Sequence, residues 1–291
     1  MDNEWLLSYS DLQRVAKLGS GVSSTVYKGT WSSKEVAIKI LRLISPAKDL
    51  NDFKKELFIM SQVSDTNIVH FYGATLEPKL CIVMELCPNG SLYHYMVANE
   101  ITWDNFFKWS CEMCSGINVL HRWKPTIVHR DLKSLNLLLN KDLTIKVCDF
   151  GLSRYVPPEG EKPQECDQTL QKLRGTYAYT APEMYHSKIY TTKSDVFSIG
   201  IIIWEMSSCV INRQFRKPYS EYSDIKHDYQ IIYQVAEQGR RPTIPVDCPK
   251  SVAAVMQQCW AQEPADRPSV EELLVHMNEI KKRYKKKKSR W

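Results

Sequence analysis

The sequence lacks a hydrophobic run long enough to cross a membrane. Its longest apolar stretch, FSIGIIIWEM, contains a glutamate near its end and is far shorter than the roughly 20 apolar residues that a spanning helix needs. The opening MDNEWLLSYSDL is polar and acidic, which is not the pattern of a signal peptide. Internal repeats are also absent. We therefore expect a soluble protein, and its 291 residues are enough for two packed lobes.

The nine cysteines lack any repeating spacing, which favours free thiols in a reducing compartment and a cytoplasmic location. CEMC at 111–114 has the spacing of a metal site, but no second pair of cysteines or histidines completes a zinc site, so we expect core packing there. The histidines form neither a metalloprotease motif nor a catalytic triad. No nucleic-acid-binding fold is visible, so we expect no specific nucleic-acid partner.

The last eleven residues, KKRYKKKKSRW, lack acidic side chains. Their eight cationic side chains exceed the net charge of +6, so the remainder of the chain has a net charge of −2. A basic tail at 281–291 is most often a solvated end. Weak contact with an anionic surface, nuclear import and nucleic-acid contact are the alternatives.

The pattern of apolar residues changes along the chain. Residues 12–43 indicate three strands, 47–63 a helix, and NIVHFYGATL and LCIVMEL two further strands. From Ser91 onward most segments have helical spacing. The sequence therefore predicts an α+β protein with a β-rich amino-terminal lobe that contains one main helix, joined near ELCPNGS to a mostly helical lobe.

LGSGVSSTVYKG, at 18–29, has the spacing of a phosphate-binding loop, except that Ser24 occupies the place of the third glycine. Taken alone, the stretch also fits a glycine-containing hairpin. Lys39 lies in an apolar strand, and Glu56 lies on the apolar stripe of the predicted helix. Each has a simple interpretation as a surface charge, but a helix carboxylate that holds a strand lysine over phosphates explains both.

IVHRDLKSLNLLL, at 127–139, is more specific. Asp131 is placed to orient an attacking hydroxyl and accept its proton, and Asn136 to hold magnesium. VCDFG then supplies Asp149 as a second metal ligand. APE at 181–183, SDVFSIG and PADRPSV follow in order.

Together these motifs resemble the catalytic domain of eukaryotic protein kinases over residues 9–280. HRDLKSLN, GTYAYTAPE and GRRPTIP are similar to the tyrosine-kinase-like group, which includes the Raf and mixed-lineage kinases. The resemblance implies a bilobal kinase fold with an N-lobe at about 9–85, a hinge at about 85–90, a C-lobe at about 91–280 and the basic tail at 281–291. It also implies ATP, protein substrates, a role in signalling and Mg²⁺, with Mn²⁺ as an alternative; the oligomeric state stays open.

The resemblance assigns roles to individual residues. Met84 would be the gatekeeper of the adenine pocket, and Val26, Ala37 and Leu138 would sandwich the adenine. The implied nucleotide-binding residues are Leu18, Gly19, Gly21, Val26, Ala37, Lys39, Met84, Glu85, Cys87 and Leu138. The implied catalytic residues are Asp131, Lys39, Glu56, Lys133, Asn136 and Asp149, of which Asn136 and Asp149 would hold the metal.

Other implied roles are structural. Met60, Phe71, His129 and Phe150 would form an apolar column that aligns the lobes. Glu183 and Arg267 would form a buried ion pair, and Asp195 would support the catalytic loop. Cys87 and Cys148 would line the ATP cleft, where small buried hydrophobes are expected and thiol regulation is the alternative.

Three features concern activity and regulation. If Ser24 adopts a left-handed backbone, it weakens nucleotide binding several-fold, and a pseudokinase scaffold is then the alternative to an active kinase. Lys133, with Thr176 in contact with Asp131, favours serine/threonine over dual specificity. Arg130 would grip a phosphate on the segment 152–180, where we choose Thr169 as the activating site.

Overall fold

The computed structural model describes residues 5–21, 23–43, 45–156, 177–186 and 189–288. The chain divides into two compact units. The first unit contains Met1–Gly90 and Leu138–Ser153, and the second contains Ser91–Leu137 and Arg154–Trp291. The chain therefore leaves the first unit at Gly90 and returns to it for sixteen residues.

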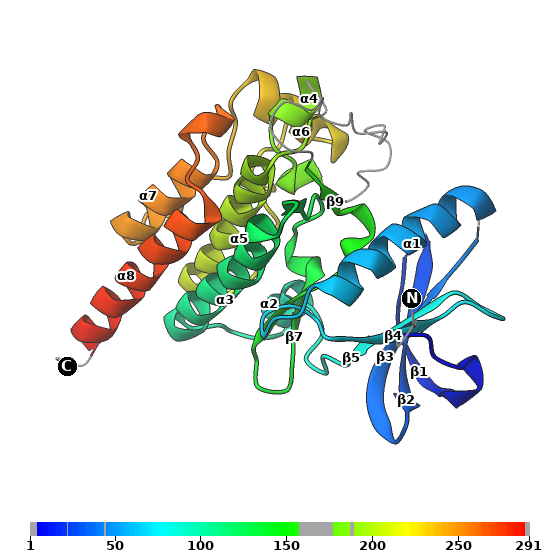
Figure 1. The fold of residues 1–291 in the computed structure, drawn as a ribbon. Coiled ribbons are helices and arrows are strands. Elements are labelled where there is room, and N and C mark those ends of the chain that lie inside the picture. The colour runs from blue at the N-terminus through cyan, green and yellow to red at the C-terminus, as the bar shows by residue number, and fades with distance from the viewer. Residues whose placement is uncertain (1–4, 22, 44, 157–176, 187–188, 289–291) are drawn as a thin grey trace. The chain divides into compact units, whose positions relative to one another are not determined.

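The first unit is built on a five-stranded antiparallel sheet in the order β1-β2-β3-β5-β4, with one long helix (Figure 1). The elements are β1 (Leu12–Ser20), β2 (Ser24–Trp31), β3 (Lys34–Leu41), α1 (Pro46–Gln62), β4 (Phe71–Thr75) and β5 (Cys81–Glu85). A short 3₁₀ helix, η1 (Tyr9–Asp11), precedes β1. The chain before it hydrogen-bonds to Ala74 from both Trp5 and Leu7, which covers the edge of β4.

Alternation along β3 gives the sheet two different faces. Val36, Ile38 and Ile40 are buried in one apolar cluster with Cys81 and Val83 of β5. Successive side chains of a strand point to opposite faces, so Ala37 and Lys39 lie on the other face. The sheet thus has one face for its own core and one face that presents Lys39.

The returning segment of the first unit carries β7 (Leu137–Leu139), β8 (Ile145–Val147) and η3 (Phe150–Leu152). The backbone of Val147 exchanges hydrogen bonds with the loop after α1, accepting from Val69 at 2.9 Å and donating to Asn67 at 2.8 Å. Within β8, Lys146 forms a 2.9 Å ion pair with Glu85 at the end of β5. These contacts fix the segment that leads directly into Asp149.

The second unit is mostly helical, as expected from the sequence (Figure 1). Its elements are α2 (Leu92–Ala98), α3 (Trp103–Arg122), β6 (Ile127–Val128), η2 (Ser134–Asn136), β9 (Arg154–Tyr155), η5 (Tyr177–Tyr179), α4 (Glu183–His186), α5 (Thr192–Asn212), α6 (Tyr229–Glu237), α7 (Lys250–Cys259), η6 (Pro264–Asp266) and α8 (Val270–Lys288). Reciprocal capping boxes begin α3, α5 and α8, formed by Thr102 with Asn105, by Thr191 with Ser194 and by Ser269 with Glu272.

α5 is the central helix of the second unit. By length and composition alone it could cross a membrane, but 89% of its most apolar window is buried inside the protein, as expected for a core helix. Its Gly200 allows close packing on α7, because an added Cβ would lie 2.8 Å from the Cβ of Cys259. The apolar run of the sequence is therefore the core of this unit.

α8 includes most of the basic segment at the end of the chain. Residues 281–288 continue the helix, so they do not form a separate extended tail. The ring of Tyr284 packs on Phe107 of α3, with ring centroids 5.0 Å apart. Further along this antiparallel pair of helices, Arg122 of α3 contacts Glu271 at 3.3 Å. The basic side chains of 282–286 thus project from an anchored helix.

Candidate active site

Lys39 lies between two carboxylates of the first unit. Its Nζ donates to Glu56 Oε1 at 2.6 Å and to Asp149 Oδ1 at 2.9 Å. Burial opposes the charge of Lys39, but the attraction of Asp149 and Glu56 outweighs this effect and raises its pKa. Lys39 is therefore a fixed cation, and the expected lysine–helix carboxylate pair is confirmed.

Asp149 has an unusual backbone conformation. Its φ of 66° lies in the left-handed region, which is uncommon for residues other than glycine. Such conformations persist only where surrounding contacts hold them, and they gather at functional sites. The β8 contacts hold Asp149 from one side and Lys39 holds its carboxylate, while 45% of its side chain stays accessible. A carboxylate placed in this way can bind Lys39 and still contact a ligand.

The face of the sheet that carries Lys39 presents the predicted adenine-binding residues. Val26 pairs with Lys39 and Ala37 pairs with Met84, so all four side chains share this face. Ala37 and Met84 are buried, whereas Leu18 on β1 is 53% exposed. The small alanine and the surrounding apolar groups leave an apolar face beside a cation, which suits a nucleotide.

The predicted hinge follows β5. Glu85 pairs with Lys146, and Cys87 is buried. Gly90 has a φ of 68°, a conformation that favours glycine, and its carbonyl accepts a 2.8 Å hydrogen bond from Leu139. Leu138 is half-buried. It is the second residue of β7 and directly precedes Leu139, which donates this hydrogen bond to Gly90. These residues belong to the first unit, together with the rest of the predicted nucleotide set.

Ser24 does not have the strained backbone that the sequence suggested. It is the first residue of β2 and pairs with Leu41 of β3, and it is not among the residues with positive φ. The left-handed penalty is therefore wrong, because an extended backbone accommodates a serine Cβ. Gly19 and Gly21 lie before it, and a Cβ added to Gly19 would have no described atom within 4 Å. The loop leaves room where phosphates would approach.

Asp131 is the centre of a polar network in the second unit. Lys133 Nζ donates to both of its carboxylate oxygens, at 3.0 and 2.7 Å. The side-chain amide of Asn136 donates to the Asp131 backbone carbonyl at 2.8 Å and to its Oδ2 at 2.9 Å. Asp131 is only 7% exposed, so these donors satisfy and orient a buried carboxylate.

Asp195 of α5 supports the loop that carries Asp131. It accepts backbone N–H bonds from His129 and Arg130, both at 2.9 Å, and a 2.9 Å bond joins it to His121 Nε2. Burial disfavours its charge, but the bond and charge of His121 and the Arg130 N–H lower its pKa overall. The predicted support of the catalytic loop by Asp195 is confirmed. It also explains how Arg130 is kept at a φ of 72°.

Ser134 and Tyr179 link the catalytic loop to α5. Their hydroxyls lie 3.2 Å apart, and the Tyr179 hydroxyl donates to Glu205 at 2.7 Å. Burial raises the pKa of Glu205 to about 8 despite the hydrogen bond from Tyr179. In the sequence, Glu205 stands out only as a charge in an apolar run. A carboxylate in the middle of a core helix was the signal that it has a fixed partner.

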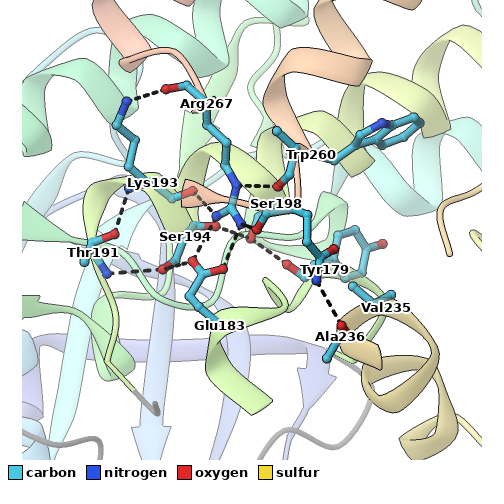
Figure 2. A network of polar contacts seen from close by, with 12 residues as sticks. Tyr179, Glu183, Thr191, Lys193, Ser194, Ser198, Val235, Ala236, Trp260 and Arg267 are labelled. Carbon is cyan, nitrogen blue, oxygen red and sulfur yellow. Dashed lines mark hydrogen bonds and ion pairs between the residues drawn. The ribbon is translucent and has the colours of Figure 1, made fainter. Parts of the chain in front are cut away.

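Glu183 and Arg267 form the expected buried ion pair (Figure 2). Arg267 binds both carboxylate oxygens, at 2.9 and 2.8 Å, in the bidentate arrangement that favours arginine. The guanidinium also donates to the carbonyls of Ala261, Lys193 and Gln262. The side chain of Arg267 is fully buried, so it joins α4 and η6 to the start of α5.

The predicted regulatory residues are only partly described. Arg130 lies over the ring of Tyr190 at 4.7 Å. Thr169 and Thr176 lie outside the described residues, so their roles stay predictions. His129 is fully buried in the second unit, and Met60 and Phe150 are buried in the first with Phe71 half-buried there. The apolar column through both units also stays a prediction.

The cysteines behave as buried thiols. Each cysteine among the described residues is free, and all but Cys248 are buried. Burial raises the pKa of Cys87 to about 12 and also raises that of Cys148, so both remain protonated. Cys111 and Cys114 lie on the buried side of α3, which confirms core packing for CEMC.

Lys146 is not among the functional residues predicted from the sequence. It is 9% exposed and neutralises Glu85, the first residue of the predicted hinge. Its signal was the same as that of Lys39, because IKV places a lysine inside a short apolar strand. Each unit also offers an oxygen that suits a hard cation: the carboxylate of Asp149 in the first and, in the second, the side-chain carbonyl of Asn136, whose amide N–H groups donate to Asp131. Such oxygens are the ligands that Mg²⁺ prefers.

Comparison with known proteins agrees with these motifs. Residues 12–277 match the family described as protein tyrosine and serine/threonine kinase. Stress-activated protein kinase alpha of Dictyostelium discoideum is 46% identical over 98% of this chain and 44% of its own length. A probable serine/threonine-protein kinase of the same organism is 46% identical over 99% of this chain and 34% of its own length. A probable tyrosine-protein kinase, also of Dictyostelium discoideum, is 35% identical over 96% of this chain and 82% of its own length. This chain spans less than half the length of the first two relatives.

Proposed function

The chain belongs to the protein tyrosine and serine/threonine kinase family, and we propose that it transfers the γ-phosphate of ATP to serine and threonine hydroxyls of proteins. The observation that carries the proposal is the environment of Asp131, a buried carboxylate held by Lys133 and Asn136. A serine/threonine protein kinase needs one oriented base beside a fixed cation, and this loop supplies both.

Asp131 accepts the proton of the substrate hydroxyl in this mechanism. The hydroxyl oxygen forms a bond to the γ-phosphorus, the bond from that phosphorus to the β–γ bridging oxygen breaks, and ADP leaves. Lys133, which contacts both oxygens of Asp131, provides a positive charge next to the transferred group. Asp195 keeps the backbone at His129 and Arg130 in place, so the base does not need to reorganise during the reaction.

The first unit binds the nucleotide. Lys39, kept cationic by Glu56 and Asp149, pairs with the phosphates, and the apolar face around Ala37 takes the adenine. Asp149 and Asn136 would hold Mg²⁺, which would neutralise charge on the phosphates when bound. Lys39 also donates to Oδ1 of Asp149 and so helps to orient that carboxylate.

Serine/threonine preference is supported by Lys133, whose place two residues after Asp131 resembles serine/threonine kinases. Several relatives are named as serine/threonine-protein kinases. Dual specificity is the second candidate, because a relative that this chain matches over most of its length is named a probable tyrosine-protein kinase. A pseudokinase scaffold loses its support, since the extended backbone of Ser24 removes the reason for weak nucleotide binding.

The test is a phosphate-transfer assay with matched peptides that differ only in a serine, threonine or tyrosine acceptor. We expect transfer to serine and threonine, and a loss of at least about a hundredfold in Lys39→Met, Asp131→Asn and Asp149→Asn. Each variant is checked for an unchanged circular dichroism spectrum. Lys55→Gln, a change of an exposed cation on α1, is the matched control and should keep full activity.

The outcomes separate the candidates. Transfer to all three acceptors would replace serine/threonine with dual specificity. ATP binding without transfer, in a folded wild-type protein, would favour the pseudokinase. Near-normal turnover of Asp149→Asn would contradict its proposed role at the metal.

We further propose that phosphorylation of Thr169 raises activity through Arg130. A phosphate adds nearly two negative charges, which a guanidinium can bind, although Arg130 lies over Tyr190 in this structure. Mass spectrometry after incubation with ATP should find phosphate at Thr169. Activity should fall in Thr169→Ala and Arg130→Ala, and full activity of unphosphorylated Thr169→Ala would contradict the proposal.

A further inference from the structure

The tip of the glycine-rich loop is attached to a pair of hydroxyl side chains. Ser20 at the end of β1 pairs with Thr25 of β2, and their hydroxyl oxygens lie 3.3 Å apart. Beyond this pair, the Gly21 N–H donates to the Ser24 carbonyl at 2.9 Å and closes the tip. The position of the tip therefore depends on how firmly the two strands are held at Ser20 and Thr25.

Arg42 contacts both strands at this point. It is the first residue after β3, and its Nη2 donates to the Ser20 hydroxyl and, at 2.8 Å, to the Thr25 hydroxyl. Its backbone N–H also donates to the Ser23 carbonyl at 2.8 Å. One residue thus makes side-chain bonds to β1 and β2 and a main-chain bond to the tip.

These bonds are suited to holding the part of the loop that the structure describes, at the point where β1 and β2 end. Hydrogen bonds from a charged donor are stronger than neutral ones, and Thr25 is 7% exposed, so its bond is largely shielded from water. An added Cβ on Gly21 would meet only the Ser24 carbonyl, at 3.9 Å, within the described chain. Segments with few packed contacts open most readily, so the loss of Arg42 should loosen the tip before the rest of the sheet.

We propose that Arg42 is a positioning residue for ATP binding. By joining Ser20 and Thr25, it keeps the glycine-rich hairpin in the arrangement that receives the phosphates, so less conformational entropy is lost when the nucleotide binds. This role rests on the proposed function, because it assigns the phosphates to this loop. It differs from the role of Lys39, which would contact the phosphates itself.

The first experiment measures steady-state kinetics with ATP as the varied substrate. Arg42→Gln should raise the KM for ATP roughly three- to tenfold, as expected for the loss of one or two hydrogen bonds, and leave kcat within about twofold. Arg42→Lys should recover part of the loss, because a lysine reaches one hydroxyl but lacks the planar fork. The control Lys55→Gln removes an exposed cation of the same unit and should leave the KM unchanged.

The second experiment asks whether Arg42 acts through the hydroxyls. The double variant Ser20→Ala, Thr25→Val should raise the KM as much as Arg42→Gln does, and combining all three changes should add no further increase. If Arg42→Gln raises the KM while the double variant behaves like wild type, Arg42 contacts the nucleotide directly and the positioning role is overturned.

The third experiment needs no catalysis. Without nucleotide, the amide hydrogens of 20–25 should exchange faster in Arg42→Gln than in wild type, while those of β3 and β5 exchange at the wild-type rate. If the wild-type protein is inactive but shows this exchange difference, the proposed kinase function is contradicted while the hold of Arg42 on the loop is supported. If the enzyme is active and Arg42→Gln leaves either the loop exchange or the KM for ATP unchanged, only the positioning role of Arg42 is overturned.

Discussion

The carboxylate of Glu205 accepts a 2.7 Å hydrogen bond from the hydroxyl of Tyr179 inside the core of the second unit. Its second oxygen, Oε2, has no hydrogen-bond partner among the described residues. A fully buried carboxylate with one oxygen unpartnered is more stable with a proton, which agrees with its pKa of about 8. Stability should therefore depend on pH through this group.

Glu205→Gln tests that dependence. The folded-state pKa lies above the unfolded one, so between about pH 4.5 and 8 the folded protein binds more protons, and wild-type stability falls as pH rises through this window. Glutamine has no such proton. The free energy of unfolding of wild type, from urea titrations, should decrease with pH relative to that of Glu205→Gln and run parallel above about pH 8. Curves that run parallel throughout would show that Glu205 is ionised in the fold.

Ser24→Gly should leave the KM for ATP within about twofold of wild type, because the extended backbone of Ser24 has no strain for glycine to relieve. Glycine within a strand is less favourable, so the free energy of unfolding should fall by about 0.5–1 kcal/mol. Kinetics with varied ATP and urea denaturation measure the two effects. A several-fold lower KM would mean that the serine side chain itself hinders the phosphates.

Arg267→Met should lower the free energy of unfolding by about 3–5 kcal/mol, since it leaves Glu183 without its bidentate partner in the interior. The matched control is Arg122→Met, which breaks an exposed pair with Glu271 and should change stability by less than about 1 kcal/mol. Thermal and urea unfolding of both variants make the comparison. Equal losses in the two would contradict a special role for the buried pair.

Replacing Lys282, Arg283, Lys285 and Lys286 with glutamine should weaken binding to phosphatidylserine vesicles about tenfold or more at low salt. Wild-type binding should itself fall as salt is added. Activity on a peptide should stay the same, and Tyr284 is kept so that the helix remains anchored on Phe107. If wild type does not bind these vesicles at low salt, the basic segment is only a solvated helix end.

Strong periodic patterns allowed the main elements to be predicted from the sequence. The three strands within 12–43 and the helix near 47–63 appear as β1, β2, β3 and α1. Helical spacing from Ser91 onward predicted a mostly helical lobe but did not mark α2 and α6 as separate helices, because seven and nine residues give little helical periodicity and α2 begins only with a single serine cap. The basic segment was assigned as a solvated end because charge dominated its composition, while the single Tyr284 that anchors it carried too weak a signal.

Ion pairs between motifs were predictable where both partners had recognisable positions, as with Lys39 and Glu56. Contacts between a motif residue and a residue outside every motif were not predictable. Nothing in the sequence joins Lys146 to Glu85, or Arg42 to Ser20, because these pairs depend on strand register and on which side of a turn a long side chain leaves. The conformation of Ser24 also depended on register, since pairing with Leu41 decides it.

The discontinuity of the first unit has a consequence for how this protein can be divided. A polypeptide ending at Gly90 would contain all five strands and α1 but would lack Val147, whose backbone completes the loop after α1, and Asp149, the second partner of Lys39. The first unit is therefore not a portable module. Truncation, proteolysis or recombination at the hinge would leave a sheet in which the half-buried Lys39 has lost one of its two counter-charges.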